Sequence, residues 1–200
     1  MRADGVSIII PCYNEGVVLE SAMRTLSSYM DRLIKEGVIT GYEVVFVENG
    51  STDNTWDVVQ ELKKRYPSVV RGYRISEKNL AKAIKVGLMR ARYKYAIYMG
   101  ADLPVEPSFI AYSIRLLKKG FHIVIASKHI GRDARDPLRR LLSKGYVALT
   151  RAIFRLRFTD VTNAKALDVR ALREVIESIP ERGFFFDLYM LYASSKAGRL

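Results

Sequence analysis

The sequence of 200 residues has a single cysteine, Cys12, and no apolar run near the roughly 18 residues that a membrane-spanning helix needs. One cysteine excludes an internal disulfide framework and a zinc site built from cysteines. The apolar stretch near the amino terminus is short and ends at Pro11, unlike a secretory signal peptide. These features predict a soluble domain in a reducing compartment, and the expected location is the cytoplasm.

Two common nucleotide-binding signatures are also missing. No G-x-G-x-x-G follows a predicted strand and no Walker sequence occurs, so dinucleotide and P-loop sites are not predicted. Hydrophobic residues make up 49% of the chain and charged residues 27%, a composition typical of a folded domain. No internal repeat or low-complexity linker divides the chain, so we expect a single domain over residues 1–200.

Acidic residues are scarce in the second half of the chain. The net charge is +12, of which residues 1–110 (15 basic, 13 acidic) carry +2 and residues 111–200 (18 basic, 8 acidic) carry +10. Within Lys128–Arg157 nine basic and two acidic side chains give +7, interleaved with apolar residues. This pattern fits a helix lying on an anionic membrane surface, or a core helix with a solvated basic face. Nucleic acid is not an expected partner, because charge alone supports it and no recognition motif occurs.

Apolar, β-branched segments alternate with segments of helical periodicity over the first 126 residues. Strands are predicted at Val6–Ile10, Glu43–Val47, Val69–Ile75, Tyr95–Met99 and Phe121–Ala126. Helices are predicted at Glu15–Lys35, from Asp53 or Asn54 to Tyr66, at Asn79–Tyr93 and at Ser108–Lys119. Further helices are expected at Leu138–Phe158, Val169–Ser178 and Phe184–Ser195, with a short strand within Asp160–Asp168. The alternation predicts an α/β fold with a mostly parallel central sheet and helices on both faces.

Polar clusters follow three of the predicted strands, at Pro11–Glu15, Glu48–Asp53 and Gly100–Asp102. Ligands of open parallel sheets bind beyond the carboxyl ends of the strands, so these clusters predict a shared site. Carboxylates there can accept hydrogen bonds from a base or ribose, or hold a divalent cation against a diphosphate. Each cluster alone would fit turns and helix caps, and Asp53 is expected to be such a cap.

The segments VSIIIPCYNE, EVVFVENGSTDNTWDVV and IYMGADLPVEPSFI resemble the inverting family 2 glycosyltransferases, which have the GT-A (nucleotide-diphospho-sugar transferase) fold. The later ASKHIGRDARDPLRRLLSKGYVALTRAIF and DVTNAKAL resemble the polyprenyl-phosphate (dolichyl-phosphate) mannose synthase branch. The resemblance covers about residues 5–198 in the family's order. It implies a nucleotide-binding part at about 1–127 and a basic, acceptor-binding part at about 128–200.

The resemblance also implies roles for individual residues in the donor and acceptor sites. Asp102 matches the last carboxylate of the D-x-D metal motif, and so implies Mg²⁺ or Mn²⁺ as cofactor. The implied nucleotide-pocket residues are Pro11, Tyr13, Glu15, Glu48 and Asn49, the last two where aspartates usually stand. The implied acceptor-phosphate residues are Lys128, Arg139 and Ser143, and Asp160 and Lys165 lie in the segment implied to close over the donor.

Several positions depart from the family pattern. The first metal aspartate is Gly100 here, so Asp102 is expected to bind metal weakly and mainly together with the donor. Pro104 replaces a common glutamine, and the Ser-Gly-Phe of the family is altered around Asn163-Ala164. A glycine-lysine-glycine stretch reads Ala81-Lys82-Ala83, and Lys82 is expected to neutralise part of the leaving-group charge.

The resulting hypothesis is transfer of a hexose, mannose from GDP-mannose, onto a polyprenyl phosphate at the cytoplasmic face of a membrane. The phosphate is largely dianionic at neutral pH and needs no general base. An alternative is a UDP-sugar enzyme with a hydroxyl acceptor, for which Asp187 is the candidate base, although packing or a buried hydrogen bond is the simpler interpretation of that residue. A second alternative is a nucleotide-binding homologue that has lost catalysis.

Overall fold

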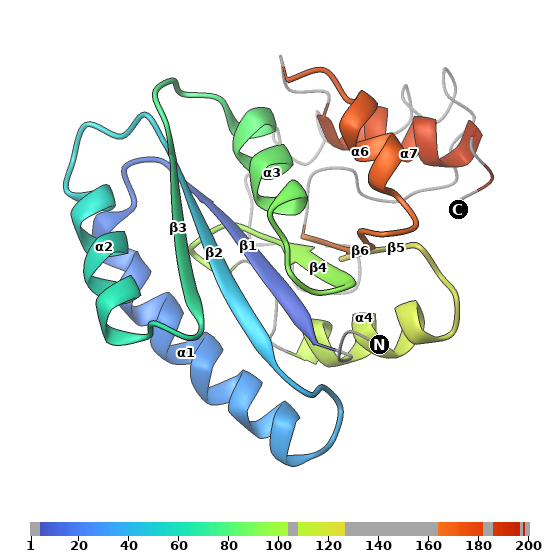
Figure 1. Ribbon diagram of the computed structural model, residues 1–200, viewed down its shortest axis with the longest axis horizontal. Coiled ribbons are helices and arrows are strands. Elements are labelled where there is room, and N and C mark those ends of the chain that lie inside the picture. Colours follow the sequence, from blue (N-terminus) through green and yellow to red (C-terminus); the bar gives the residue numbers. More distant parts are fainter. Residues whose placement is uncertain (1–4, 104–107, 127–163, 182–185, 197, 199–200) are drawn as a thin grey trace, which may run out of the picture.

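The computed structural model describes residues 5–103, 108–126, 164–181, 186–196 and 198. Strands and helices alternate along this part of the chain, as the sequence predicts (Figure 1). The strands are β1 (Val6–Cys12), β2 (Tyr42–Asn49), β3 (Val70–Ile75), β4 (Tyr95–Tyr98), β5 (Ile123–Ile125) and β6 (Lys165–Asp168). The helices are α1 (Gly16–Lys35), α2 (Thr55–Arg65), α3 (Leu80–Met89), α4 (Ser108–Lys118), α6 (Arg173–Ser178) and α7 (Phe186–Lys196).

The strands form one six-stranded sheet in the order β3-β2-β1-β4-β6-β5. The pairs β3·β2, β2·β1 and β1·β4 are parallel, whereas β6 runs antiparallel to both β4 and β5. The predicted α/β fold with a mostly parallel sheet is therefore confirmed. Because β1, β2 and β4 run in the same direction, their carboxyl ends lie at one edge of the sheet.

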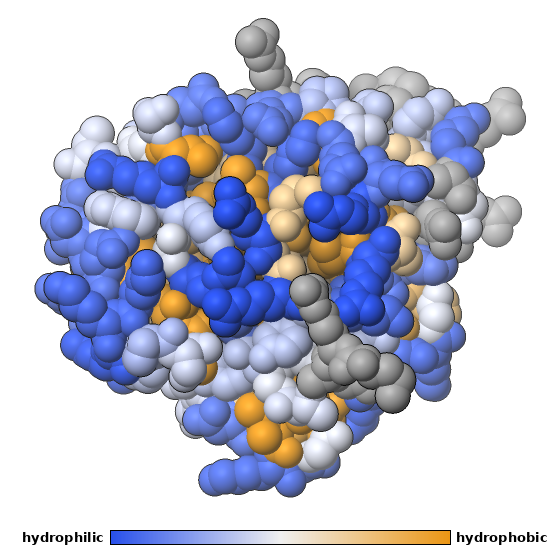
Figure 2. All heavy atoms as spheres, viewed as in Figure 1, coloured by the Kyte–Doolittle hydropathy of each residue, from blue (hydrophilic) through white to orange (hydrophobic). Residues whose placement is uncertain are grey.

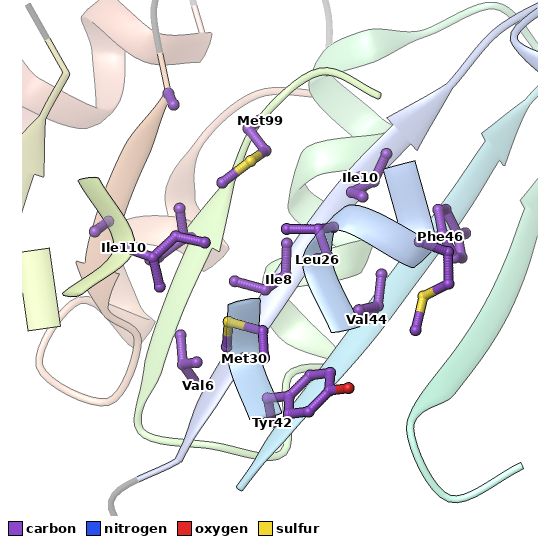
Figure 3. Packing of buried hydrophobic residues seen from close by; sticks show 14 of the residues in the cluster. Val6, Ile8, Ile10, Leu26, Met30, Tyr42, Val44, Phe46, Met99 and Ile110 are labelled. Carbon is purple, nitrogen blue, oxygen red and sulfur yellow. The ribbon is translucent and has the colours of Figure 1, made fainter. Parts of the chain in front are cut away.

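Helices cover both faces of the sheet and enclose two apolar cores. On one face, α1 and α2 pack against side chains of β1 and β2 that include Ile8, Val44 and Phe46, and α4 packs against β4, β5 and β6. Figure 3 shows Leu26 and Met30 of α1 among the side chains of β1 and β2. On the other face, α3 packs against the alternate side chains of β1 and β2, α6 packs against α3 and α7, and all three helices contribute to the second apolar core. Strands buried on both faces explain the continuous apolar runs in the sequence.

Strand β1 continues through Pro11 to Cys12, two residues beyond the predicted end at Ile10. Pairing with β4 ends at Ile9, so at Pro11 the strand has a neighbour only in β2. The missing N–H of a proline is tolerated where one side of a strand is unpaired.

Helix α3 ends at Met89, and the prediction that it reaches Tyr93 is wrong. The backbone N–H groups that follow are taken by buried side chains of other strands. Arg92 N donates to Glu43 Oε1 at 2.6 Å, and Tyr93 N donates to Ser7 Oγ at 3.3 Å. These acceptors lie far away in sequence, so the local helical pattern could not reveal them.

The region of highest positive charge lies largely outside the described residues, including the predicted helix at Leu138–Phe158. No helix within the described ranges is long and apolar enough to cross a membrane. Hydrophilic side chains predominate on the face shown in Figure 2, with small apolar areas between them.

Candidate functional site

The loops that follow β1 and β2 are joined by hydrogen bonds. Asn14 N donates to Ser51 Oγ at 3.1 Å, and Thr52 N donates to Asn14 Oδ1 at 2.8 Å. Asn14 has a φ of 54°, in the left-handed region that asparagine tolerates better than most residues. The first two predicted clusters therefore form one continuous rim at the carboxyl edge of the sheet.

Asp53 connects this rim to the first residues of α1 and α2 through hydrogen bonds. Its carboxylate accepts hydrogen bonds from Thr55 N at 3.0 Å and from Gly16 N at 3.4 Å. The hydroxyl of Thr55 also donates a hydrogen bond to Asp53. This bond contributes most to lowering the pKa of Asp53, and the backbone bonds lower it further. Asp53 therefore acts as the helix cap that the sequence predicts, at the start of both α1 and α2.

Glu48, expected near the nucleotide base, is completely buried. Its Oε1 accepts a hydrogen bond from Ser51 N, and its Oε2 forms an ion pair with Arg74 Nε at 2.7 Å. Arg74 is 53% exposed, and its guanidinium lies 5.7 Å from the ring of Trp56. The carboxylate thus holds a partly exposed cation at the rim, and the neighbouring Asn49 is also buried.

A second cation lies next to Tyr13. The ammonium of Lys78 lies 3.9 Å from the centre of the Tyr13 ring, a cation–π contact between the β1 loop and the segment before α3. The sequence analysis missed both Arg74 and Lys78. Arg74 reaches the rim because the register of β3 places it opposite Glu48.

Glu15 and Asp102 bring the third cluster into the same site. The pKa of Glu15 is raised to about 6 by burial, by the charge of Asp102 and by that of Asp53, in that order. Asp102 is exposed and lies in a turn closed by a hydrogen bond from Leu103 N to Gly100 O at 3.2 Å. Leu103 has a φ of 49°, which is strained for a leucine, so the backbone is held in a costly conformation beside Asp102.

Two oxygen donors at this point fit a hard divalent cation. Asp102 offers an exposed carboxylate, and the buried Oε2 of Glu15 has no hydrogen-bond partner within the part of the chain that the structure describes. No group of three or more His, Cys, Asp or Glu side chains suited to a metal occurs among the described residues. The set therefore fits Mg²⁺ or Mn²⁺ that takes its other ligands from a diphosphate and water.

Lys82 lies near the start of α3, where Asn79 Oδ1 accepts a hydrogen bond from the backbone N–H of Lys82 at 3.0 Å. Its ammonium contacts Glu77 Oε1 at 2.9 Å, and this hydrogen bond, with the charge of Glu77, raises the pKa of Lys82. The half-buried Pro11 precedes the β1 loop. The expected roles of these residues stay predictions.

Lys165 is the first residue of β6 and pairs with Tyr98, the last residue of β4. Its side chain is fully buried on β6 and forms an ion pair with Asp187 Oδ1 of α7 at 3.0 Å. Tyr98 also donates a hydrogen bond to that oxygen, so Asp187 makes the buried hydrogen bond that the simpler sequence interpretation predicts. The other expected residues, Lys128, Arg139, Ser143 and Asp160, lie outside the described residues, as does Pro104.

The strand order of this sheet and the helices on both of its faces define the GT-A fold, which solved structures of glycosyltransferases share. Residues 7–176 match the family model for glycosyl transferase family 2. The chain therefore belongs to this family.

The names of the matched relatives indicate different sugars. The chain is 32% identical over 190 residues to a dolichol-phosphate mannosyltransferase of Pyrococcus furiosus, an alignment covering 92% of this chain and 51% of the relative. It is 28% identical over 118 residues to a poly-β-1,6-N-acetyl-D-glucosamine synthase of Staphylococcus epidermidis, covering 59% of this chain and 26% of that protein. The chain thus spans about half the length of the first relative and less of the second.

Solved structures share the fold at low sequence identity. A mannosyltransferase of Pyrobaculum calidifontis, in complex with GDP-Man and Mn²⁺, has a TM-score of 0.62 at 18% identity, covering 95% of this chain and 51% of that one. A glucosyl-3-phosphoglycerate synthase of Mycobacterium tuberculosis, in complex with UDP, has a TM-score of 0.67 at 16% identity, covering 96% and 66%. A further complex of that synthase contains Mn²⁺ together with UDP.

Proposed function

We propose that this domain transfers a hexose, mannose from GDP-mannose, with inversion onto the phosphate of a polyprenyl phosphate such as dolichyl phosphate. The observation that carries the proposal is the rim at which Glu15, Glu48 and Asp102 converge from three strand ends. The similarity to the Pyrococcus furiosus dolichol-phosphate mannosyltransferase supports the choice of donor and acceptor.

The donor nucleoside would bind along the loops that follow β1 and β2. Tyr13 offers an aromatic ring there, and the ion pair between Glu48 and Arg74 holds a guanidinium at the same rim. A guanidinium can donate two hydrogen bonds to the O6 and N7 acceptors of guanine, a pattern that uracil does not offer. This chemistry favours a guanine nucleotide as donor.

The leaving diphosphate would lie at Glu15 and Asp102. A divalent cation held there with the diphosphate supplies electrostatic stabilisation of the negative charge that develops on the leaving group. Asp102 is exposed on a turn whose backbone is constrained at Leu103, and its carboxylate would reach the donor from this turn. Lys82, near the start of α3, would add positive charge.

The acceptor would attack with an oxygen of its own phosphate. That oxygen forms the bond to the anomeric carbon while the bond from this carbon to the diphosphate breaks, and GDP leaves. Because the phosphate is already ionised, the step needs orientation and not proton removal. Asp187, the candidate base for a hydroxyl acceptor, is occupied by Tyr98 and Lys165, which favours the phosphate acceptor. Lys128, Arg139 and Ser143 are proposed to orient it.

The proposed setting is the cytoplasmic surface of a membrane, as a peripheral protein. The support is the concentration of positive charge in residues 111–200, which carry +10 of the net charge. Anionic lipid attracts such a surface, and a polyprenyl phosphate presents its headgroup at the same interface.

The test is a transfer assay with radiolabelled GDP-mannose, UDP-glucose and UDP-N-acetylglucosamine, each with dolichyl phosphate or a free sugar as acceptor, in Mg²⁺ or Mn²⁺. Mannose transfer from GDP-mannose to dolichyl phosphate is expected, and transfer to free sugar alone would assign the UDP-sugar alternative. Nucleotide binding without transfer would instead indicate a homologue that has lost catalysis.

The decisive variant is Asp102→Asn, which removes the charge and keeps the shape. Turnover is expected to fall about 10²- to 10³-fold, the usual effect of losing one group that stabilises transition-state charge. Asp57→Asn, an exposed carboxylate on α2, is the matched control and should transfer at the wild-type rate. Equal rates for the two variants would remove Asp102 from the reaction.

A further inference from the structure

Three side chains from three elements meet behind the carboxyl end of β4. The ammonium of Lys165 on β6 lies 3.0 Å from Asp187 Oδ1 of α7 and 5.3 Å from the centre of the Tyr98 ring on β4. The Tyr98 hydroxyl donates to the same oxygen of Asp187. Tyr98 and Lys165 are direct partners in the antiparallel register, so their side chains lie on the same face of the sheet.

This arrangement is costly for folding. Lys165 is completely buried, and the Tyr98 side chain that it contacts is buried too and packs edge-on against Phe186 with 6.4 Å between ring centres. Replacing a buried ion pair by apolar side chains of similar volume is often neutral or stabilising. Stability alone therefore does not explain why a lysine and an aspartate occupy these positions.

The location connects the network to the donor site. Tyr98 is the last residue of β4, and only three residues separate it from Asp102. Met99 N donates to Ile9 O at 3.1 Å, which ties the next residue to the centre of the sheet. The turn from Gly100 to Leu103, which carries Asp102, follows Met99 directly, so the end of β4 sets where this turn begins.

We propose that Lys165 is a positioning residue for the donor site: it holds Asp187 and, through it, the Tyr98 end of β4 that carries the Asp102 turn. The proposal deepens the proposed function and rests on it, because it needs a donor diphosphate at Asp102. It differs from the direct donor contact that the family resemblance implies for Lys165. It also assigns Asp187 to positioning and not to proton transfer.

The charge of Lys165 matters in this network because it balances Asp187. Without it, Asp187 would keep a negative charge near the buried hydroxyl of Tyr98, and the carboxylate would turn toward water, to which it is already 23% exposed. Removing both charges together takes away that tendency. A positioning pair therefore predicts that the double variant is closer to wild type than the single one.

The experiment compares Lys165→Met, Asp187→Leu, the double variant and Tyr98→Phe. Calorimetry measures GDP affinity in Mn²⁺ for each protein, after circular dichroism has confirmed that it is folded at the measuring temperature. The transfer assay then gives kcat and the KM for the donor. Lys94→Met is the matched control, since Lys94 pairs with Asp168 at 3.4 Å and contacts the Tyr95 ring at the opposite end of the same two strands.

The expected result is GDP affinity about tenfold weaker, with a matching rise in donor KM, for Lys165→Met, and recovery of most of this loss in the double variant. Lys94→Met should bind GDP as wild type does, although this variant also loses an ion pair to a buried aspartate. Wild-type GDP affinity in Lys165→Met would overturn the proposal. A second result would also overturn the proposal: kcat falls 100-fold or more in Asp187→Leu and in the double variant while GDP affinity stays intact. That pattern is the one expected of a general base.

If Lys165→Met does not fold, Tyr98→Phe carries the test, since it removes one hydroxyl and keeps the ring. GDP affinity weakened several-fold supports the proposal, and unchanged affinity overturns it. A wild-type protein that binds UDP and not GDP refutes the proposed donor only, and the same comparison is then made with UDP. A wild type that binds neither nucleotide refutes both proposals.

Discussion

Glu15 is the carboxylate whose ionisation depends most visibly on the candidate site. Its pKa of about 6 in the folded protein compares with 4.5 for an ordinary glutamate, so the folded state binds more protons between these values. Stability therefore falls as the pH rises through this window. The loss is about 1 kcal/mol, because solvent screens a half-exposed group and reduces the effect of the full shift.

Glu15→Gln should remove this penalty. The variant is expected to be about 1 kcal/mol more stable than wild type at pH 7.5 and equal to it at pH 4.5, in urea unfolding without nucleotide or metal. Glu61→Gln, on the exposed face of α2, controls for the loss of one charge and should show no such pH difference. A Glu15→Gln variant that is destabilised at pH 7.5 would contradict the raised pKa.

At this scale the sequence predicted residues that belong to a motif and missed those defined by contact. Glu15, Glu48 and Asp102 follow strands in recognisable segments, so their convergence could be expected from strand direction alone. Arg74 and Lys78 lie at the rim because of the β3 register and the path into α3. Neither feature leaves a pattern in the sequence.

Helix α3 lies close against β1 and β2, and a glycine allows this approach. A Cβ on the buried Gly87 would overlap Cγ2 of Ile9 on β1 and would lie 3.4 Å from Cγ2 of Val47 on β2. Ile9 is fully buried and β-branched, so its methyl group has no free space to move into. The position of α3, and hence of Lys78 and Lys82 before and within it, depends on this contact.

Gly87→Ala is therefore expected to destabilise the protein by about 1–2 kcal/mol, because overpacking costs more than the gain in helix propensity returns. Urea unfolding measures the change. Ser28→Ala on the exposed side of α1 is the control, and it should be neutral or slightly stabilising. A Gly87→Ala protein as stable as wild type would mean that α3 can move away from β1 without cost.

A helix or strand could be predicted from the sequence where one hydrophobic periodicity extends over its whole length. The apolar spacing of α1 is an example, and Gly37, which follows the C-cap Glu36 with a φ of 69°, is a signal for the end of the helix that is visible in the sequence. The end of α3 was not predictable, because Glu43 and Ser7 accept the backbone N–H groups of Arg92 and Tyr93. The antiparallel placement of β6 likewise follows from tertiary packing.

Over the whole molecule, the two edges of the sheet carry different kinds of polar group. At the amino edge, the buried Glu43 accepts from Ser7 Oγ at 2.7 Å and pairs with Arg71 Nη1 at 3.2 Å, so its charge is satisfied within the fold. At the carboxyl edge, Glu15 keeps a buried oxygen without a hydrogen-bond partner among the described residues, and Asp102 is exposed. The carboxylates that the fold leaves available, Glu15 and Asp102, therefore lie where a ligand is proposed to bind.

Charge is also divided along the chain, and this division makes the proposed membrane contact testable. The protein should bind vesicles containing anionic lipid, should not bind neutral vesicles, and should lose about tenfold or more in affinity when salt rises from about 0.05 to 0.5 M. Arg135→Glu/Lys144→Glu reverses two charges inside the basic segment, and Lys63→Glu/Lys64→Glu makes the same change on the exposed side of α2. Co-sedimentation with vesicles should weaken strongly for the first pair and little for the second, because attraction to a surface depends on where the charge lies. Equal weakening by both pairs would mean that only the net charge of +12 matters, and would contradict a defined membrane-facing segment.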